Sequence, residues 1–67
     1  MTIKKAKLYR TAVVASKLEG FGLIEGDVVS VSFVSRGAFG LNFKISSPYM
    51  QIEPAVVSEH DLKEFVL

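Results

Sequence analysis

The sequence predicts one all-β (mainly β) domain over residues 1–67, a small barrel of four to five antiparallel strands with a short C-terminal helix. Three observations lead to this prediction. Two central segments alternate between apolar and small polar residues, glycines separate the segments at turn positions, and a helix-start pattern follows Ser58. A chain of this length buries only about 60% of the surface that its unfolded form exposes, so one small core is expected.

The N-terminal segment 6–14 is expected to form the first strand. Its core face would carry Ala6, Leu8, Ala12 and Val14. Two glycine turns follow, Glu19-Gly20-Phe21-Gly22 and Glu25-Gly26-Asp27, because glycine adopts the positive φ angles that tight loops require.

The segments 28–34 and 39–45 are expected to form a central hairpin, and both place odd-numbered residues in the core. A two-residue loop would pair odd with even positions and separate the two apolar faces. A three-residue loop of residues 35–37 instead places Phe33 opposite Phe39. This loop type ends in a left-handed residue, so Gly37 is predicted to have a positive φ.

The last third of the chain predicts an edge strand and a helix. Pro54 cannot donate to a strand ladder, which favours an edge position or a bulge for the strand before Ser58. Its core face is expected to carry Met50, Ile52 and Val56. Ser58 then fits a helix N-cap, with Asp61 three residues later. The helix would pack on the barrel through Leu62, Phe65 and Val66.

Two segments carry a resemblance to a known family. Gly26-Asp27-Val28-Val29-Ser30-Val31 resembles the turn and strand that open SH3-like small β-barrels, and Ser58-Glu59-His60-Asp61-Leu62 is similar to the ending of some bacterial members. This resemblance implies an SH3-like barrel fold. The same Gly-Asp-x-Val-x-Val pattern also resembles DNA-binding swapped-hairpin dimers, which implies basic residues near the N-terminal strand.

Charge is unevenly distributed although the net charge is only +1. The first eighteen residues contain five cations and no acid, namely Lys4, Lys5, Lys7, Arg10 and Lys17. The last nineteen contain Glu53, Glu59, Asp61 and Glu64 against Lys63. Either the basic segment binds phosphate, or the two ends lie together and neutralise each other.

No pattern in the sequence predicts catalysis, so no enzyme activity and no catalytic residue are expected. Ser58, His60 and Asp61 are too close along the chain for a triad, whose members come from separate elements. With no cysteine and one histidine, neither a metal site nor a cofactor is expected. No apolar run is long enough to span a bilayer and no signal-peptide pattern is present, so a cytoplasmic location without a membrane partner is expected.

Two functions follow as hypotheses. The first is a non-catalytic, self-associating protein-interaction module, because the chain is 49% hydrophobic and one small barrel has little room for these residues. Its homo-oligomer contact would use Val28, Ser30, Ser32 and Val34, and another protein is a further expected partner. The alternative is a nucleic-acid-binding barrel. It would use the basic N-terminal strand and one later lysine, through Lys4, Lys5, Lys7, Tyr9, Arg10 and Lys44.

Overall fold

The computed structural model of the chain describes residues 1–48, 50 and 55–67, and it confirms a mainly-β architecture. Five antiparallel strands form one sheet. The elements in chain order are α1 (Ile3–Ala6), β1 (Thr11–Val14), the 3₁₀ turn η1 (Glu19–Phe21), β2 (Val28–Gly37), β3 (Gly40–Ser46), β4 (Ala55–Ser58), the 3₁₀ turn η2 (Glu59–Asp61) and β5 (Leu62–Val66).

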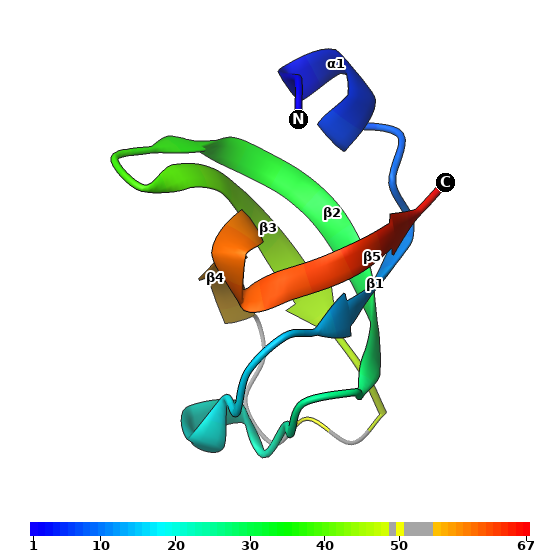
Figure 1. Ribbon diagram of the computed structural model, residues 1–67, viewed down its shortest axis with the longest axis vertical. Coiled ribbons are helices and arrows are strands. Elements are labelled where there is room, and N and C mark those ends of the chain that lie inside the picture. Colours follow the sequence, from blue (N-terminus) through cyan, green and yellow to red (C-terminus); the bar gives the residue numbers. More distant parts are fainter. Residues whose placement is uncertain (49, 51–54) are drawn as a thin grey trace.

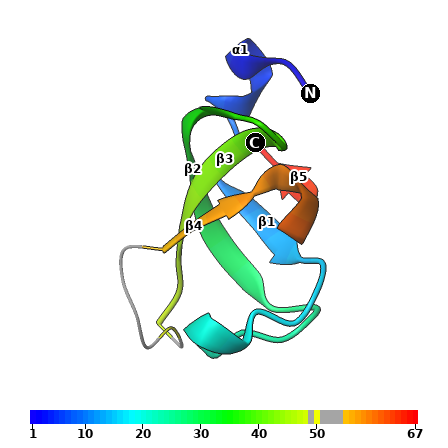
Figure 2. The ribbon, with the colours of Figure 1, turned by 90° about the vertical axis from the view of Figure 1, so that its left-hand side faces the viewer.

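The strand order is β4-β3-β2-β1-β5, so four strands follow one another and β5 returns to pair with β1 (Figure 1). The fourth strand is an edge strand, one of the two alternatives that the sequence predicts for it. The sheet is open rather than closed into a barrel. Its two edge strands are nevertheless consecutive in the chain and are joined by the three residues of η2. Figure 2 shows α1 at one end of the sheet and η1 at the other.

The hairpin between β2 and β3 differs from the prediction. Gly37 pairs with Gly40 across a two-residue loop, and Phe33 pairs with Phe43 rather than with Phe39. The odd-numbered residues of both strands still share one face, although the loop has two residues. The reason is that Val34 is an extra residue, a bulge, where the register shifts between Phe33 and Ser35. One bulged residue restores the match between the two apolar faces. Phe39 is therefore in the loop, where it is 83% exposed.

The prediction of a positive φ at Gly37 is wrong; in this hairpin it is Gly40 that has a positive φ, of +117°. Glycine adopts this conformation without steric cost. A second constraint acts on Gly40, because a Cβ there would lie 2.9 Å from Oε2 of Glu59. The same carboxylate oxygen accepts a 2.6 Å hydrogen bond from the backbone N–H of Leu41. Glu59 thus continues the pairing of β3 with β4 beyond the end of β4, and it joins η2 to the hairpin.

The first predicted strand begins later than expected, at Thr11. Residues 3–6 form one helical turn because the Thr2 side chain caps it, accepting a 3.2 Å hydrogen bond from the N–H of Lys5. Ala6 packs against the core as predicted, whereas Leu8 is 59% exposed and does not.

The predicted C-terminal helix is wrong beyond its first turn. Ser58 does cap η2, accepting a 3.2 Å hydrogen bond from the N–H of His60. The chain then becomes β5, because pairing with β1 satisfies backbone groups that would otherwise be unpaired at a sheet edge. Of the predicted helical face, Leu62 is buried, Phe65 is partly buried and Val66 is 56% exposed.

The core face of β4 is also the reverse of the prediction. Ala55 and Val57 are buried, while Val56 is exposed opposite Lys44. The inward positions follow from the register with β3, since Ala55 pairs with the buried Ile45 and Val57 with the buried Phe43. The predicted core residue Ile52 and the strand-breaking Pro54 lie outside the described residues.

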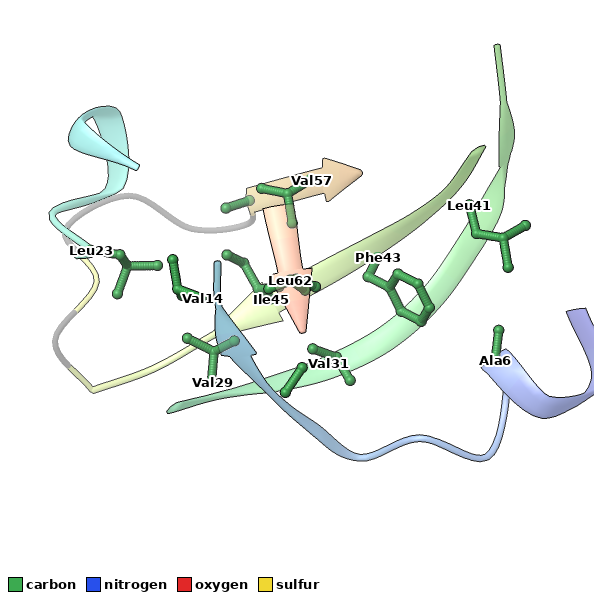
Figure 3. Packing of buried hydrophobic residues seen from close by; sticks show 12 residues of the cluster. Ala6, Val14, Leu23, Val29, Val31, Leu41, Phe43, Ile45, Val57 and Leu62 are labelled. Atoms are coloured by element: carbon green, nitrogen blue, oxygen red, sulfur yellow. The ribbon is translucent and has the colours of Figure 1, made fainter. Parts of the chain in front are cut away.

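Phe43 is at the centre of the core and is fully buried. Its ring lies 6.0 Å from the ring of Phe33 and 5.1 Å from that of Phe65, which in turn lies 5.1 Å from the ring of Tyr9. Figure 3 shows the aliphatic residues around Phe43, with Leu23 and Ala6 at opposite ends of the cluster. This packing ties β5 and the segment before β1 to the middle strands.

We expect the substitution Gly40→Ala to destabilise the fold by about 1–3 kcal/mol, because it combines backbone strain with a clash against the Glu59 carboxylate. Urea denaturation measures the change. Gly20→Ala is the matched control, since a Cβ at Gly20 meets no atom within 4 Å and its φ is not positive. The control should stay within about 0.5 kcal/mol of the parent. Equal stability of the two variants would contradict the assigned role of Gly40.

Candidate functional site

The outward face of the sheet is lined with small hydroxyl side chains where β1, β2 and β3 run together. Ser30 of β2 pairs with Thr11 of β1 on one side and with Ser46 of β3 on the other. One step further along β2, Ser32 pairs with Lys44. Directly opposite residues share a face of the sheet, so the register places these five side chains on the same surface.

A hollow of about 600 Å³ lies on this face beside the middle of β2. One wall is the segment 7–11, which contains Lys7, Leu8, Tyr9 and Arg10, and the other is the segment 30–32. Two backbone hydrogen bonds hold the first wall in place. The carbonyl of Arg10 accepts from the N–H of Val31 at 2.9 Å, and the N–H of Arg10 donates to the carbonyl of Val66 at 2.8 Å.

A second hollow of about 250 Å³ adjoins the first. It lies between the segment 30–32 of β2 and residues 44–46 of β3, so the two hollows share three residues of β2. Together they form one shallow surface across three strands. We call this surface the outer-face track, and we define it by its polar side chains Lys7, Arg10, Thr11, Ser30, Ser32, Lys44 and Ser46.

The outer-face track is positively charged. Lys7, Arg10 and Lys44 line it, and no carboxylate among the described residues does. Within the part of the chain that the structure describes, the side chains of these three cations have no carboxylate partner. Two carboxylates elsewhere are already engaged with backbone N–H groups, that of Asp27 with Ile24 and that of Glu59 with Leu41.

The basic and acidic ends of the chain do lie together, since β1 pairs with β5. The carbonyl of Val66 accepts from the N–H of Arg10, but this contact is between backbones. Pairing of the two ends therefore leaves the cations of the track available to an anion.

Four of the six predicted nucleic-acid-binding residues line the two hollows, namely Lys7, Tyr9, Arg10 and Lys44. The other two, Lys4 and Lys5, line neither hollow. They are on the helical turn α1, so the prediction that they belong to a strand is wrong. Tyr9 lines the first hollow, and its ring packs on Phe65 beside the buried core.

The predicted oligomer contact is exposed along β2. Val28 is 64% exposed and Val34 is 49% exposed, and Ser30 and Ser32 between them are exposed as well. The two serines belong to the outer-face track, whereas Val34 is at the bulge. The alternation of residues along the sequence predicts that these side chains face outward, and the structure places Lys44 directly opposite Ser32.

Ser58 and His60 form the cap of the 3₁₀ turn η2, which also contains Asp61. The Ser58 hydroxyl accepts from the backbone N–H of His60, so both are part of the start of η2. Among the described residues, no group of three or more His, Asp or Glu side chains could hold a metal ion. The described helices are all too short to cross a membrane.

Sequence reasoning missed Thr11 and Ser46 as members of the surface. Both were identifiable only through the pairing of three strands, because each is a single hydroxyl residue in an ordinary strand. Leu8 was assigned to the core and instead lies in the wall of the first hollow. Comparison of the chain with protein-family models, curated proteins and solved structures finds no match.

Proposed function

We propose that the protein is a non-catalytic binding domain that binds nucleic acid through the outer-face track. The observation that carries this proposal is that Lys7 and Arg10 line one hollow and Lys44 lines the adjoining one, with no described carboxylate lining either. Segments far apart in the sequence supply these cations, so their convergence is a property of the fold.

The chemistry of the track suits a phosphodiester backbone. Lysine and arginine neutralise phosphates, and serine and threonine hydroxyls donate hydrogen bonds to phosphate and sugar oxygens. Four residues with hydroxyl side chains line the same surface as the cations, at Thr11, Ser30, Ser32 and Ser46. Three cations support modest, salt-sensitive binding with little dependence on base sequence.

The SH3-like barrel expected from the sequence belongs to the same proposal. Its support is the small antiparallel sheet of five strands, with the two edge strands joined by the 3₁₀ turn η2. The Gly26-Asp27 turn opens β2 in the structure, as in the resemblance, and the Ser58 segment leads into the last strand.

We expect Lys44→Gln and Arg10→Gln each to weaken the binding of a fluorescein-labelled oligonucleotide roughly two- to fivefold, since each removes one exposed ion pair with a phosphate. Fluorescence anisotropy at low and moderate salt measures the change. Lys17→Gln is the control, because Lys17 lines neither hollow. The three variants should unfold within about 0.5 kcal/mol of the parent. If the parent binds no nucleic acid at low salt, or if Lys17→Gln weakens binding as much as Lys44→Gln, the proposal is wrong.

A second candidate function is self-association, with Val28, Ser30, Ser32 and Val34 at the contact. The observation favouring it is that nine large hydrophobic side chains are exposed among the described residues, including Val28 and Val34 at the two ends of this surface. It ranks second because Lys44 lies beside Ser32 on the same face. A two-fold contact there would bring like charges together, which is unfavourable in an interface.

Sedimentation equilibrium tests self-association. If this second candidate is right, the mass exceeds 7.3 kDa at micromolar concentration, and Val34→Lys lowers it towards the monomer value by placing a charge in the contact. Ile24→Lys, at another exposed apolar position, should leave the mass unchanged. A species of monomer mass that persists as the concentration rises excludes this candidate.

A further inference from the structure

We infer that the outer-face track takes a single nucleic-acid strand rather than a duplex, with the strand lying across β1, β2 and β3. This inference rests on the proposed function. It adds the class of nucleic acid and the direction of the bound chain.

The direction follows from where the cations lie relative to β2. Lys44 is opposite Ser32 on the β3 side, while the carbonyl of Arg10 is bonded to the N–H of Val31 on the β1 side. The two cations therefore flank the same short stretch of β2 from opposite sides. Neighbouring strands lie about 4.8 Å apart, so the backbones that carry the cations are about 10 Å apart. A backbone that contacts both cations crosses the strands.

The shape of the track favours a single strand. Reading the base sequence of a duplex requires an element that enters a groove, such as a helix or a two-stranded ribbon, whereas phosphate contacts alone suit a duplex or a single strand. Here the cations line two adjoining hollows, and both hollows are also lined by Ser30 and Ser32, whose side chains are small. A hollow can receive an unpaired base and its sugar, whereas the bases of a duplex are stacked inside the helix.

The wall of the first hollow supplies the contact for a base. Leu8 is 59% exposed there, next to Tyr9, whose ring is held against Phe65 at 5.1 Å. Single-strand-binding surfaces combine a cationic groove with aromatic side chains on which bases stack, and apolar side chains can also pack against an unpaired base. The exposure of Leu8 is thus explained as a base contact beside the phosphate contacts of Lys7 and Arg10.

The experiment compares three probes by fluorescence anisotropy: a labelled single-stranded oligothymidylate of about ten nucleotides, a duplex of the same length, and unlabelled polyphosphate as a competitor. We expect the single strand to bind at least about fivefold more tightly than the duplex. The logarithm of the association constant should fall with the logarithm of salt concentration with a slope of about −1.4 to −2.1, which corresponds to two or three phosphates.

The substitution Leu8→Ser separates base contact from charge. It should weaken single-strand binding at least about threefold and leave competition by polyphosphate unchanged, because it removes apolar surface and no charge. Ile24→Ser, at an equally exposed position, is the matched control and should change neither. Duplex binding equal to or tighter than single-strand binding would overturn this inference while the proposed function stands. So would an unchanged affinity in Leu8→Ser. Failure of every nucleic-acid probe to bind would overturn both proposals.

Discussion

Val34 has no partner on β3, and the pairing of the two longest strands depends on it. Without this bulge, the two-residue loop would place the buried residues of β2 opposite the exposed residues of β3. With it, Phe33 meets Phe43 on the core face, while Ser32 meets Lys44 on the outward face. The same residue therefore fixes both the core and the surface proposed to bind nucleic acid.

The remaining strands extend this register in both directions. On one side β4 places Val57 beside Phe43, and the Glu59 carboxylate continues the pairing at the hairpin. On the other side β1 aligns Thr11 with Ser30, and β5 covers the far edge of β1. The aromatic contacts from Phe43 through Phe65 to Tyr9 then hold the wall of the first hollow. These ring contacts connect the packing of the core to the segment that lines the outer-face track.

The sequence predicts the parts of the fold that depend on alternation, such as the burial of Val29, Val31 and Ile45. It does not predict loop type, because glycines on both sides of Ala38-Phe39 offer two turns and only three-dimensional packing selects Gly40. The C-terminal strand was missed because its spacing also fits a helix, and the unpaired edge of β1 decided the outcome. For the site, the cations could be identified from the sequence. Their hydroxyl neighbours could not, since they come together through strand register.

Cross-strand nuclear Overhauser effects test this register most directly. The account predicts contacts between the α-protons or side chains of Phe33 and Phe43 and between those of Ser32 and Lys44, because each pair is directly opposite across β2 and β3. It also predicts a Phe39 ring without long-range contacts to the core. Contacts between Phe33 and Phe39 would show a hairpin with a three-residue loop and no bulge at Val34, and they would contradict both the core and the outer-face track described above.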